Sequence, residues 1–270
     1  MDVAKELVLS KDQLVEWRRH FHKYPELSFQ EEKTSQFVFD ILREIPCLEV
    51  SRPTKYSVMA RLIGKQPGKI VAVRADMDAL PIHEENEFDF ISTYPGVMHA
   101  CGHDGHIAIL LGVVHKLVEA REKIKGEIRF LFQHAEENFP GGAEEMVAAG
   151  VMEGIDYIIG AHLWASLEVG KVGVIYGPAM AAPDVFKIII EGKGGHAGIP
   201  HETVDSIAIG TQVVSQLQQI VSRLTNPLDS LVVSVTQFHA GTTHNVIPEQ
   251  AEIEGTVRSL RHESVSYTHL

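Results

Sequence analysis

Residues 70–81 read Ile-Val-Ala-Val-Arg-Ala-Asp-Met-Asp-Ala-Leu-Pro, a β-branched run that passes into two aspartates and ends at a proline. Such a run predicts a buried strand over residues 70–73, with Asp76 and Asp78 beyond its carboxyl end. Ligand-type side chains that directly follow an apolar strand are typical of α/β sheets, whose sites form at the strand ends. This stretch therefore indicates both the fold class and the place of the chemistry.

Strands and helices alternate on both sides of this stretch. The sequence pattern predicts helices over 10–24, 31–44, 107–120 and 142–149, and further strands over 57–63, 127–132 and 157–161. This alternation predicts an α/β fold with a mostly parallel sheet, in which the strand carboxyl ends converge on one edge.

The pattern changes after Pro183. The predicted elements are then a strand, a long helix and two strands, over 184–191, 204–224, 231–238 and 251–257. This β-α-β-β order is typical of a small two-layer α+β domain. We therefore predict a first domain over residues 1–182 and a second domain over residues 183–270.

The composition excludes several kinds of partner. The 270 residues are 44% hydrophobic and 22% charged, as in ordinary globular proteins. A formal net charge of −12 disfavours binding to nucleic acid and to anionic membrane surfaces. The sequence carries no signal-peptide pattern or apolar run of membrane-spanning length, and its two cysteines, Cys47 and Cys101, are far apart. These features predict a reducing, cytoplasmic location.

The segment over residues 98–106 is the richest in metal-ligand side chains, and it reads Met-His-Ala-Cys-Gly-His-Asp-Gly-His. Thiolate and imidazole are the ligands that zinc and related metals prefer. Cys101 and His103 flank Gly102 in a predicted loop, so both can face one site. A surface histidine cluster beside a buried cysteine is the alternative, but the density of ligand residues favours a metal site.

Three more strand ends deliver ligand-type side chains. Asp78 can orient a ligand histidine through its second ring nitrogen. Glu136 and Glu137 diverge just past a strand, so one can bind metal while the other serves as general base. His162 follows the next strand. Taken alone, the aspartates could simply pair with Arg74, and the two glutamates could simply be solvated. The convergence of all these side chains on one edge of the sheet favours a functional site.

Together these motifs resemble the dinuclear metallo-aminoacylase and carboxypeptidase family, in its branch of hippurate hydrolases, auxin–amino acid conjugate hydrolases and N-acyl-L-amino acid amidohydrolases. The resemblance covers residues 10–262 and rests on motifs at 21–27, 74–81, 98–106, 134–137, 194–197 and 244–248. It implies a zinc-peptidase-like catalytic domain with an inserted α+β lid and dimerisation domain.

The resemblance also implies a role for individual residues. Cys101 would bridge two divalent metal ions (zinc, manganese or cobalt), and Asp78 would lie behind the ligands. The further ligands would be His103, Glu137 and His162. Glu136 would be the general base that takes a proton from the attacking water and gives it to the leaving amine.

Two residues of the lid would complete the site. His196 resembles the lid histidine that stabilises the developing oxyanion, often in the other subunit, and Asn245 resembles a substrate or transition-state contact. Without the resemblance, His196 is a loop histidine and Asn245 a turn residue. The implied substrate is an N-acyl amino acid or a similar small amide, and the implied partner is a second copy of the chain.

Three other functions remain open at this point. The same scaffold could serve a dipeptidase or another exopeptidase, and a chain that binds metal without catalysis is a different class. A thiol hydrolase that uses Cys101 as nucleophile is disfavoured, because neighbouring ligands would capture the thiolate.

The chain ends at Leu270, inside the predicted lid. In the family, a further segment returns from the lid to complete the catalytic domain and supplies the last ligand histidine. We therefore expect this sequence to be truncated, residues 264–270 not to be native, and His269 not to replace that ligand.

Overall fold

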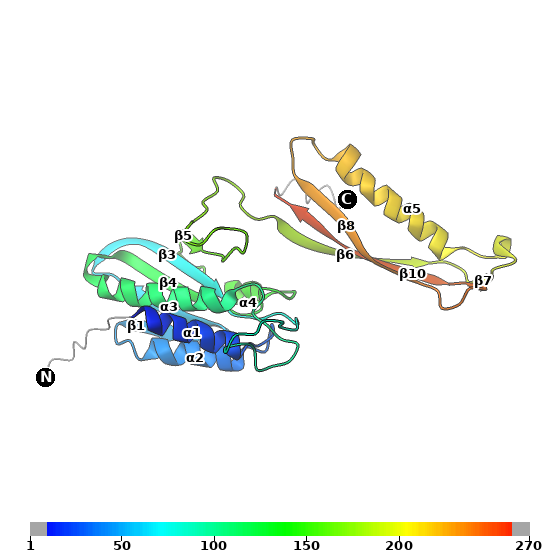
Figure 1. Cartoon of the computed structure of the whole chain (residues 1–270). Coiled ribbons are helices and arrows are strands. Elements are labelled where there is room, and N and C mark those ends of the chain that lie inside the picture. Colours follow the sequence, from blue (N-terminus) through cyan, green and yellow to red (C-terminus); the bar gives the residue numbers. More distant parts are fainter. Residues whose placement is uncertain (1–9, 261–270) are drawn as a thin grey trace. The chain divides into compact units, whose positions relative to one another are not determined.

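The computed structural model describes residues 10–260 of the chain. They fold into two compact units, the first ending at Glu168 and the second beginning at Val169 (Figure 1). The first unit is a sheet covered by helices, and the second is a smaller sheet with one long helix. The predicted α/β fold class is confirmed. The expected features of residues 264–270, His269 included, lie outside the described residues.

The first unit is built on a five-stranded sheet. Its strands are β1 (Leu48–Ser51), β2 (Val58–Ile63), β3 (Gln66–Asp76), β4 (Lys125–Gln133) and β5 (Tyr157–Gly160), in the spatial order β1-β2-β4-β3-β5. β3 runs parallel to both β4 and β5, and only β2 opposes the common direction. The prediction of a mostly parallel sheet is therefore confirmed. β3 lies between β4 and β5, so the residues that follow these three strands lie side by side at the carboxyl edge.

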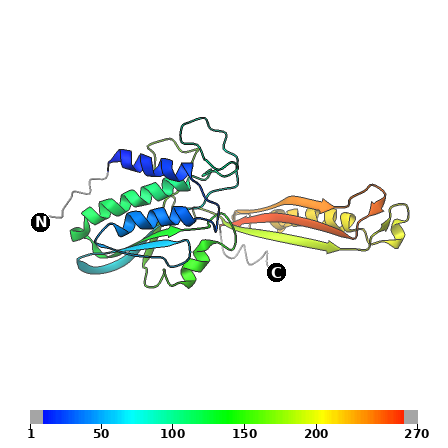
Figure 2. The same ribbon diagram turned by 90° about the horizontal axis from the view of Figure 1, so that it is seen from below.

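Helices cover both faces of this sheet (Figure 2). Three of them, α1 (Lys11–Lys23), α2 (Glu32–Arg43) and α3 (His103–Glu119), share one core with the sheet, which includes Phe21, Leu42, Leu111, Phe130 and Phe132. The short α4 (Gly142–Ala148) packs its Met146 against Ala72 and Leu131 on the opposite face. A 3₁₀ turn, η1 (Arg121–Lys123), connects α3 to β4.

Two local predictions differ from the structure. α3 begins at His103 and not near residue 107, because Gly102 adopts a left-handed conformation (φ 85°) and turns the chain directly into the helix. His103 is thus the first helical residue and not part of a loop. β3 begins at Gln66 and not at the predicted Ile70, and β1 was not predicted. Gly68 makes the early start of β3 possible, since a Cβ there would lie 2.7 Å from the Gly126 nitrogen.

The second unit is an antiparallel sheet of β6 (Ala182–Glu191), β10 (Gln250–Ser259) and β8 (Leu231–Ala240), with β10 in the centre. One helix, α5 (Ser206–Gln219), continues into a π-helical turn, η3 (Ile220–Leu224), and packs Val213 and Leu217 against the sheet. Asp205 caps α5 by accepting the amides of Ile207 and Ala208. The described helices include none with both the length and the apolarity needed to span a membrane.

Candidate metal centre

Most of the predicted site residues lie together at the carboxyl edge of the first unit's sheet. Each comes from a different element: Asp78 follows β3, His103 begins α3, Glu136 and Glu137 follow β4, and His162 follows β5. Cys101 precedes α3 by two residues. The fold therefore brings to one edge residues that the sequence separates by as many as 84 positions, from Asp78 to His162.

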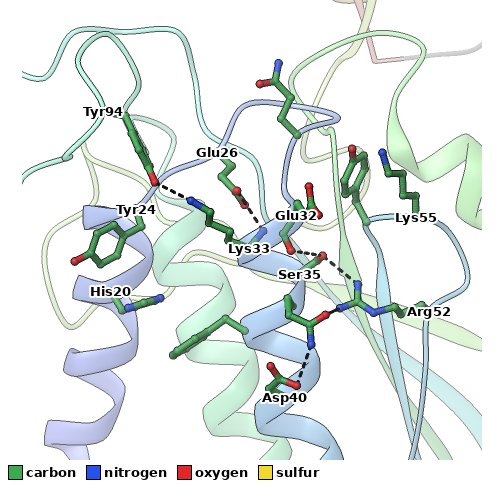
Figure 3. A pocket seen from close by; sticks show the side chains of 14 residues that line it. His20, Tyr24, Glu26, Glu32, Lys33, Ser35, Asp40, Arg52, Lys55 and Tyr94 are labelled. Atoms are coloured by element: carbon green, nitrogen blue, oxygen red, sulfur yellow. Dashed lines mark hydrogen bonds between the residues drawn. The ribbon is translucent and has the colours of Figure 1, made fainter.

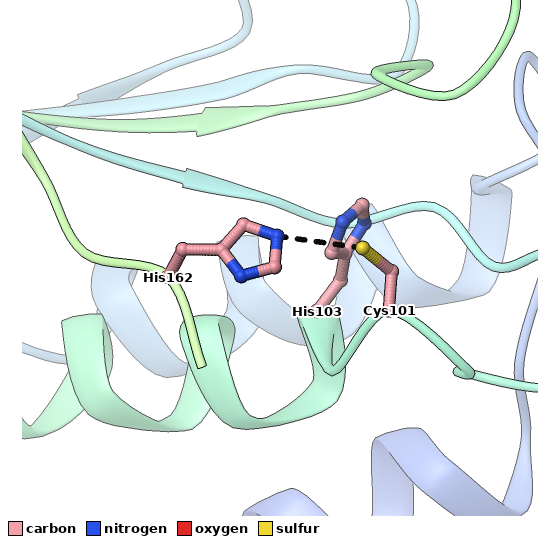
Figure 4. Close-up of side chains that lie close together, drawn as sticks. All are labelled: Cys101, His103 and His162. Atoms are coloured by element: carbon pink, nitrogen blue, oxygen red, sulfur yellow. Dashed lines mark hydrogen bonds between the residues drawn. The ribbon is translucent and has the colours of Figure 1, made fainter. Parts of the chain in front are cut away.

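Three sets of possible ligands among the described residues share His103, and one of them joins it to Asp76 and His106. The ligand atoms of Cys101, His103 and His162 lie within 4.8 Å of one another, and Cys101 Sγ is 3.4 Å from His162 Nε2 (Figure 4). His103, Glu136 and Glu137 form a second set under the same limit. A donor set of thiolate, imidazole and carboxylate suits zinc and neighbouring divalent metals. The residues present therefore fit a dinuclear metal site.

His103 is buried at the centre of this cluster. Its Nδ1 lies 3.3 Å from Asp78 Oδ1, and its Nε2 lies 3.8 Å from Glu137 Oε1. Neither ring nitrogen has a hydrogen-bond partner of good geometry among the described residues. Buried imidazole nitrogens without partners are costly unless something else satisfies them. A cation on Nε2 would do so, while Asp78 orients the ring through Nδ1.

Asp78 also fixes the backbone of the glutamate segment. Its Oδ2 accepts hydrogen bonds from Ser28 Oγ at 2.7 Å and from the Glu137 amide at 2.9 Å. Burial raises the pKa of Asp78, but His103 and these hydrogen bonds outweigh burial and lower the pKa to about 2. Asp78 is therefore ionised at neutral pH and contacts two of the predicted ligands, His103 and Glu137.

Cys101 is poorly suited to act as a nucleophile. Burial and the neighbouring Glu137 carboxylate raise the pKa of its thiol to about 12. A thiol with this pKa is protonated at neutral pH, and the thiolate is the reactive form. A coordinated cation would deprotonate the same thiol. The geometry and the pKa together favour Cys101 as a metal ligand over Cys101 as the nucleophile of a thiol hydrolase.

Glu136 lies beside the cluster with its side chain exposed to solvent. Partial burial raises its pKa, and the nearby carboxylates of Glu137 and Asp76 raise it further. A general base works best when its pKa lies close to the working pH. This carboxylate can therefore accept a proton from a water that approaches the cluster.

Sequence reasoning missed His106, one turn after His103 on α3. Its buried ring lies with Nδ1 2.6 Å from Asp76 Oδ1, and its Nε2 accepts the Leu163 amide at 2.8 Å. The ring thus ties the loop that carries His162 to the end of β3. The signal in the sequence was the i, i+3 spacing of His103 and His106, which places both rings on one helix face.

The two predicted lid residues lie in the second unit. A short ladder pairs β7 (Gly195–His196) with β9 (Val246–Ile247), and the Ala197 amide donates to the Asn245 carbonyl at 3.1 Å. His196 and Asn245 are therefore near each other, and both are exposed. His196 Nδ1 accepts the Gly198 amide at 3.0 Å, which leaves Nε2 to carry the proton and donate it.

An open pocket of about 1210 Å³ lies on the first unit but includes none of the predicted ligands. Residues of α1, α2 and the loop after β1 line it, together with Tyr94 (Figure 3). Within it, the Glu26 carboxylate accepts the amides of Lys33 and Thr34 at the start of α2. This contact caps α2, so the pocket's polar lining has a structural explanation.

Gly142 allows the glutamate segment to turn back on itself. Its amide donates to the Ala135 carbonyl at 2.9 Å, and a Cβ at this position would lie 2.1 Å from the His134 carbonyl oxygen. We expect Gly142→Ala to lower the free energy of unfolding by about 1–3 kcal/mol, because the backbone must shift to relieve the clash. Urea unfolding of both chains measures this.

Gly173→Ala is the matched control, since a Cβ on Gly173 would meet nothing within 4 Å. Equal unfolding midpoints for the two variants would contradict the close packing of Gly142 against His134.

Comparison with known proteins identifies the family of this chain. Residues 72–265 match the model of Peptidase family M20/M25/M40. The chain belongs to this family. It is 66% identical to an N-acyl-L-amino acid amidohydrolase of Geobacillus stearothermophilus over 249 residues, which are 92% of this chain and 67% of that protein.

Two other relatives of this peptidase family extend the comparison. Thermostable carboxypeptidase 1 of Saccharolobus solfataricus is 45% identical, with 96% of this chain and 68% of that protein covered. The crystal structure of the Bacillus subtilis YXEP protein, a dinuclear metal binding peptidase from the M20 family, superposes with a TM-score of 0.80. Its identity is 40%, covering 95% of this chain and 66% of that one. The chain thus spans about two thirds of the length of these relatives.

Proposed function

We propose that this protein hydrolyses the amide bond of N-acyl amino acids with two divalent metal ions. The observation that carries the proposal is the set of Cys101, His103, Glu137 and His162 around one sheet edge, with the carboxylate of Glu136 beside them. The amidohydrolase that is 66% identical supports the substrate class. The donor set fits zinc, manganese or cobalt.

Each described residue has a separate task in this proposal. Cys101, His103, Glu137 and His162 would hold the ions, and Asp78 would keep the His103 ring and the Glu137 backbone in place. When bound, the ions polarise the scissile carbonyl and lower the pKa of water. Glu136 accepts the proton of the attacking water and delivers it to the leaving nitrogen, so that one carboxylate serves both proton transfers.

The second unit would supply the remaining contacts. The His196 Nε2–H group would donate a hydrogen bond to the developing oxyanion, and Asn245 would contact the substrate carboxylate or the transition state. We also propose that the second unit forms a homodimer interface and that the protein is cytoplasmic. The net charge of −12 supports neither nucleic acid nor anionic membranes as a partner.

An exopeptidase is the second candidate, since a carboxypeptidase is 45% identical to the chain. The two functions differ in what precedes the scissile bond. A carboxypeptidase or aminoacylase accepts a blocked α-amine, whereas a dipeptidase requires a free one.

We expect hydrolysis of N-acetyl amino acids to stop after chelation and to return when zinc, manganese or cobalt is added, because the proposed site needs metal for any turnover. The measurement is amine release from an N-acetyl amino acid, an N-benzoyl amino acid and an unblocked dipeptide. Faster cleavage of the dipeptide would favour a dipeptidase, and metal binding without any cleavage would favour a non-catalytic role for this chain.

A further inference from the structure

The loop between α1 and α2 leads into Glu31, which contacts the glutamate segment of the candidate site. Glu31, at the start of α2, has a fully buried side chain, and its Oε1 accepts the Ala135 amide at 2.6 Å. The two residues are 104 positions apart. Ala135 directly precedes Glu136 and Glu137, so the contact reaches the backbone that carries both carboxylates.

Ala135 has an unusual backbone conformation. Its φ is +46°, in the left-handed region that residues with a Cβ rarely adopt, and its side chain is completely buried. Such a conformation persists only where surrounding contacts impose it. The change of direction at Ala135 lets the chain leave β4 and present Glu136 and Glu137 to the cluster of His103.

Three hydrogen bonds impose this conformation. Glu31 binds the Ala135 amide, Gly142 donates to the Ala135 carbonyl at 2.9 Å, and Asp78 accepts the Glu137 amide at 2.9 Å. Two of the three partners are buried carboxylates. Ser28, from the same loop as Glu31, donates to Asp78 and joins the two carboxylates into one support.

Glu31 has no other evident task. Its Oε2 is buried without a hydrogen-bond partner among the described residues, and it makes no side-chain cap for α2. Burial raises its pKa to about 7, while the Ala135 hydrogen bond opposes that rise. Removing a carboxyl from water is costly, and the 2.6 Å hydrogen bond from the strained Ala135 offsets part of that cost.

We propose that Glu31 is a positioning residue: its carboxylate fixes the left-handed conformation of Ala135 and thereby the placement of the ligand Glu137 and the base Glu136. This inference rests on the proposed metal-dependent function. It gives the loop before α2 an indirect part in metal binding. In the described structure, Ser28 and Glu31 reach the predicted ligands only through their contacts with Asp78 and Ala135.

The test compares Glu31→Ala, Glu31→Gln and Glu32→Gln in the 270-residue chain. Glu32 is the adjacent glutamate and is exposed, so it is the matched control. Two quantities are measured: the affinity and visible spectrum of bound Co²⁺, and amide hydrogen exchange over residues 130–138 in the absence of metal. The thermal midpoint of each metal-free chain shows whether it is folded.

We expect Glu31→Ala to weaken Co²⁺ binding by about 10- to 100-fold, which is the usual effect of removing a residue that holds metal ligands in place. Exchange should accelerate over residues 130–138 and remain unchanged elsewhere, since only that segment loses a contact. Glu31→Gln keeps an oxygen that can accept the Ala135 amide and should recover most of the loss. Glu32→Gln should match the wild-type chain.

Ala135→Gly gives a second, independent test. Glycine adopts the left-handed conformation without penalty, so this change should soften the effect of Glu31→Ala. An unchanged effect would overturn the proposed route through Ala135, as would wild-type Co²⁺ affinity in Glu31→Ala. If Glu31→Ala does not fold, the Co²⁺ affinity of Glu31→Gln decides. Near wild-type affinity in Glu31→Gln supports the proposal. A loss of affinity as large as that caused by Glu137→Ala overturns it.

Failure of the proposed function has a different signature. A wild-type chain that binds no Co²⁺ would contradict the metal site itself. Even then, faster exchange over residues 130–138 in Glu31→Ala, but not in Glu32→Gln, would show that Glu31 fixes this segment.

Discussion

Replacing Glu136 by alanine is expected to reduce the turnover of N-acyl amino acids by about 100- to 10,000-fold while leaving metal binding intact. The reason lies in the site geometry. Glu136 belongs to the cluster but is exposed, and its raised pKa suits proton transfer more than permanent charge. Steady-state hydrolysis rates and the metal content of the same preparation measure the two effects together.

The matched control for Glu136→Ala is Glu144→Ala, an exposed glutamate of the neighbouring helix α4 that belongs to none of the ligand groups. It should retain both turnover and metal. Glu136→Gln refines the test, since it preserves the shape of the side chain and removes only the base. Wild-type rates in Glu136→Gln would exclude Glu136 as the general base. Loss of bound metal in this variant would show that Glu136 is a ligand.

Glu136 and Glu137 differ in the groups that surround their carboxylates. Asp78 binds the Glu137 amide, and the Glu137 carboxylate points towards the buried His103. The Glu136 carboxylate has a pKa that partial burial and the nearby carboxylates of Glu137 and Asp76 raise. Two identical, adjacent side chains can therefore be assigned different tasks, because the turn at Ala135 directs them differently.

The sequence predicted those parts of the fold that depend on local pattern. The helix over 10–24 and the strand over 127–132 correspond to α1 and β4, because apolar spacing reports directly which face is buried. The convergence of ligand-type residues followed from one general property, that parallel strands end at the same edge of a sheet. No knowledge of the strand order was needed for that step.

The supports of the site could not be predicted in this way. Glu31 meets Ala135 across 104 positions, and His106 meets Asp76 across 30. Neither contact leaves a periodic signal, because each depends on how α2 and α3 lie on the sheet. The early start of α3 at His103 was missed for a related reason: the left-handed Gly102 resembles an ordinary loop glycine in the sequence.

Replacing His103 by alanine is expected to have the largest effect on metal binding, with affinity lowered by more than about 100-fold, since even residues behind the ligands contribute about 10- to 100-fold. His103 belongs to each of the three possible ligand groups in the described part of the chain, so no remaining group keeps its full set of donors. Elemental mass spectrometry of the metal-loaded chain, followed by titration with zinc, measures the loss.

The control must separate loss of a ligand from loss of packing, because His103 is buried. His115→Ala serves this purpose: His115 is a buried histidine on the same helix, with no hydrogen-bond partner for its ring among the described residues, and it packs against Trp17. Both variants remove a buried imidazole from α3 and leave a cavity, so both should lose stability. Only His103→Ala should lose metal. Equal metal content in the two variants would show that His103 is not the central ligand. The reason for placing two ions at this sheet edge would then be lost.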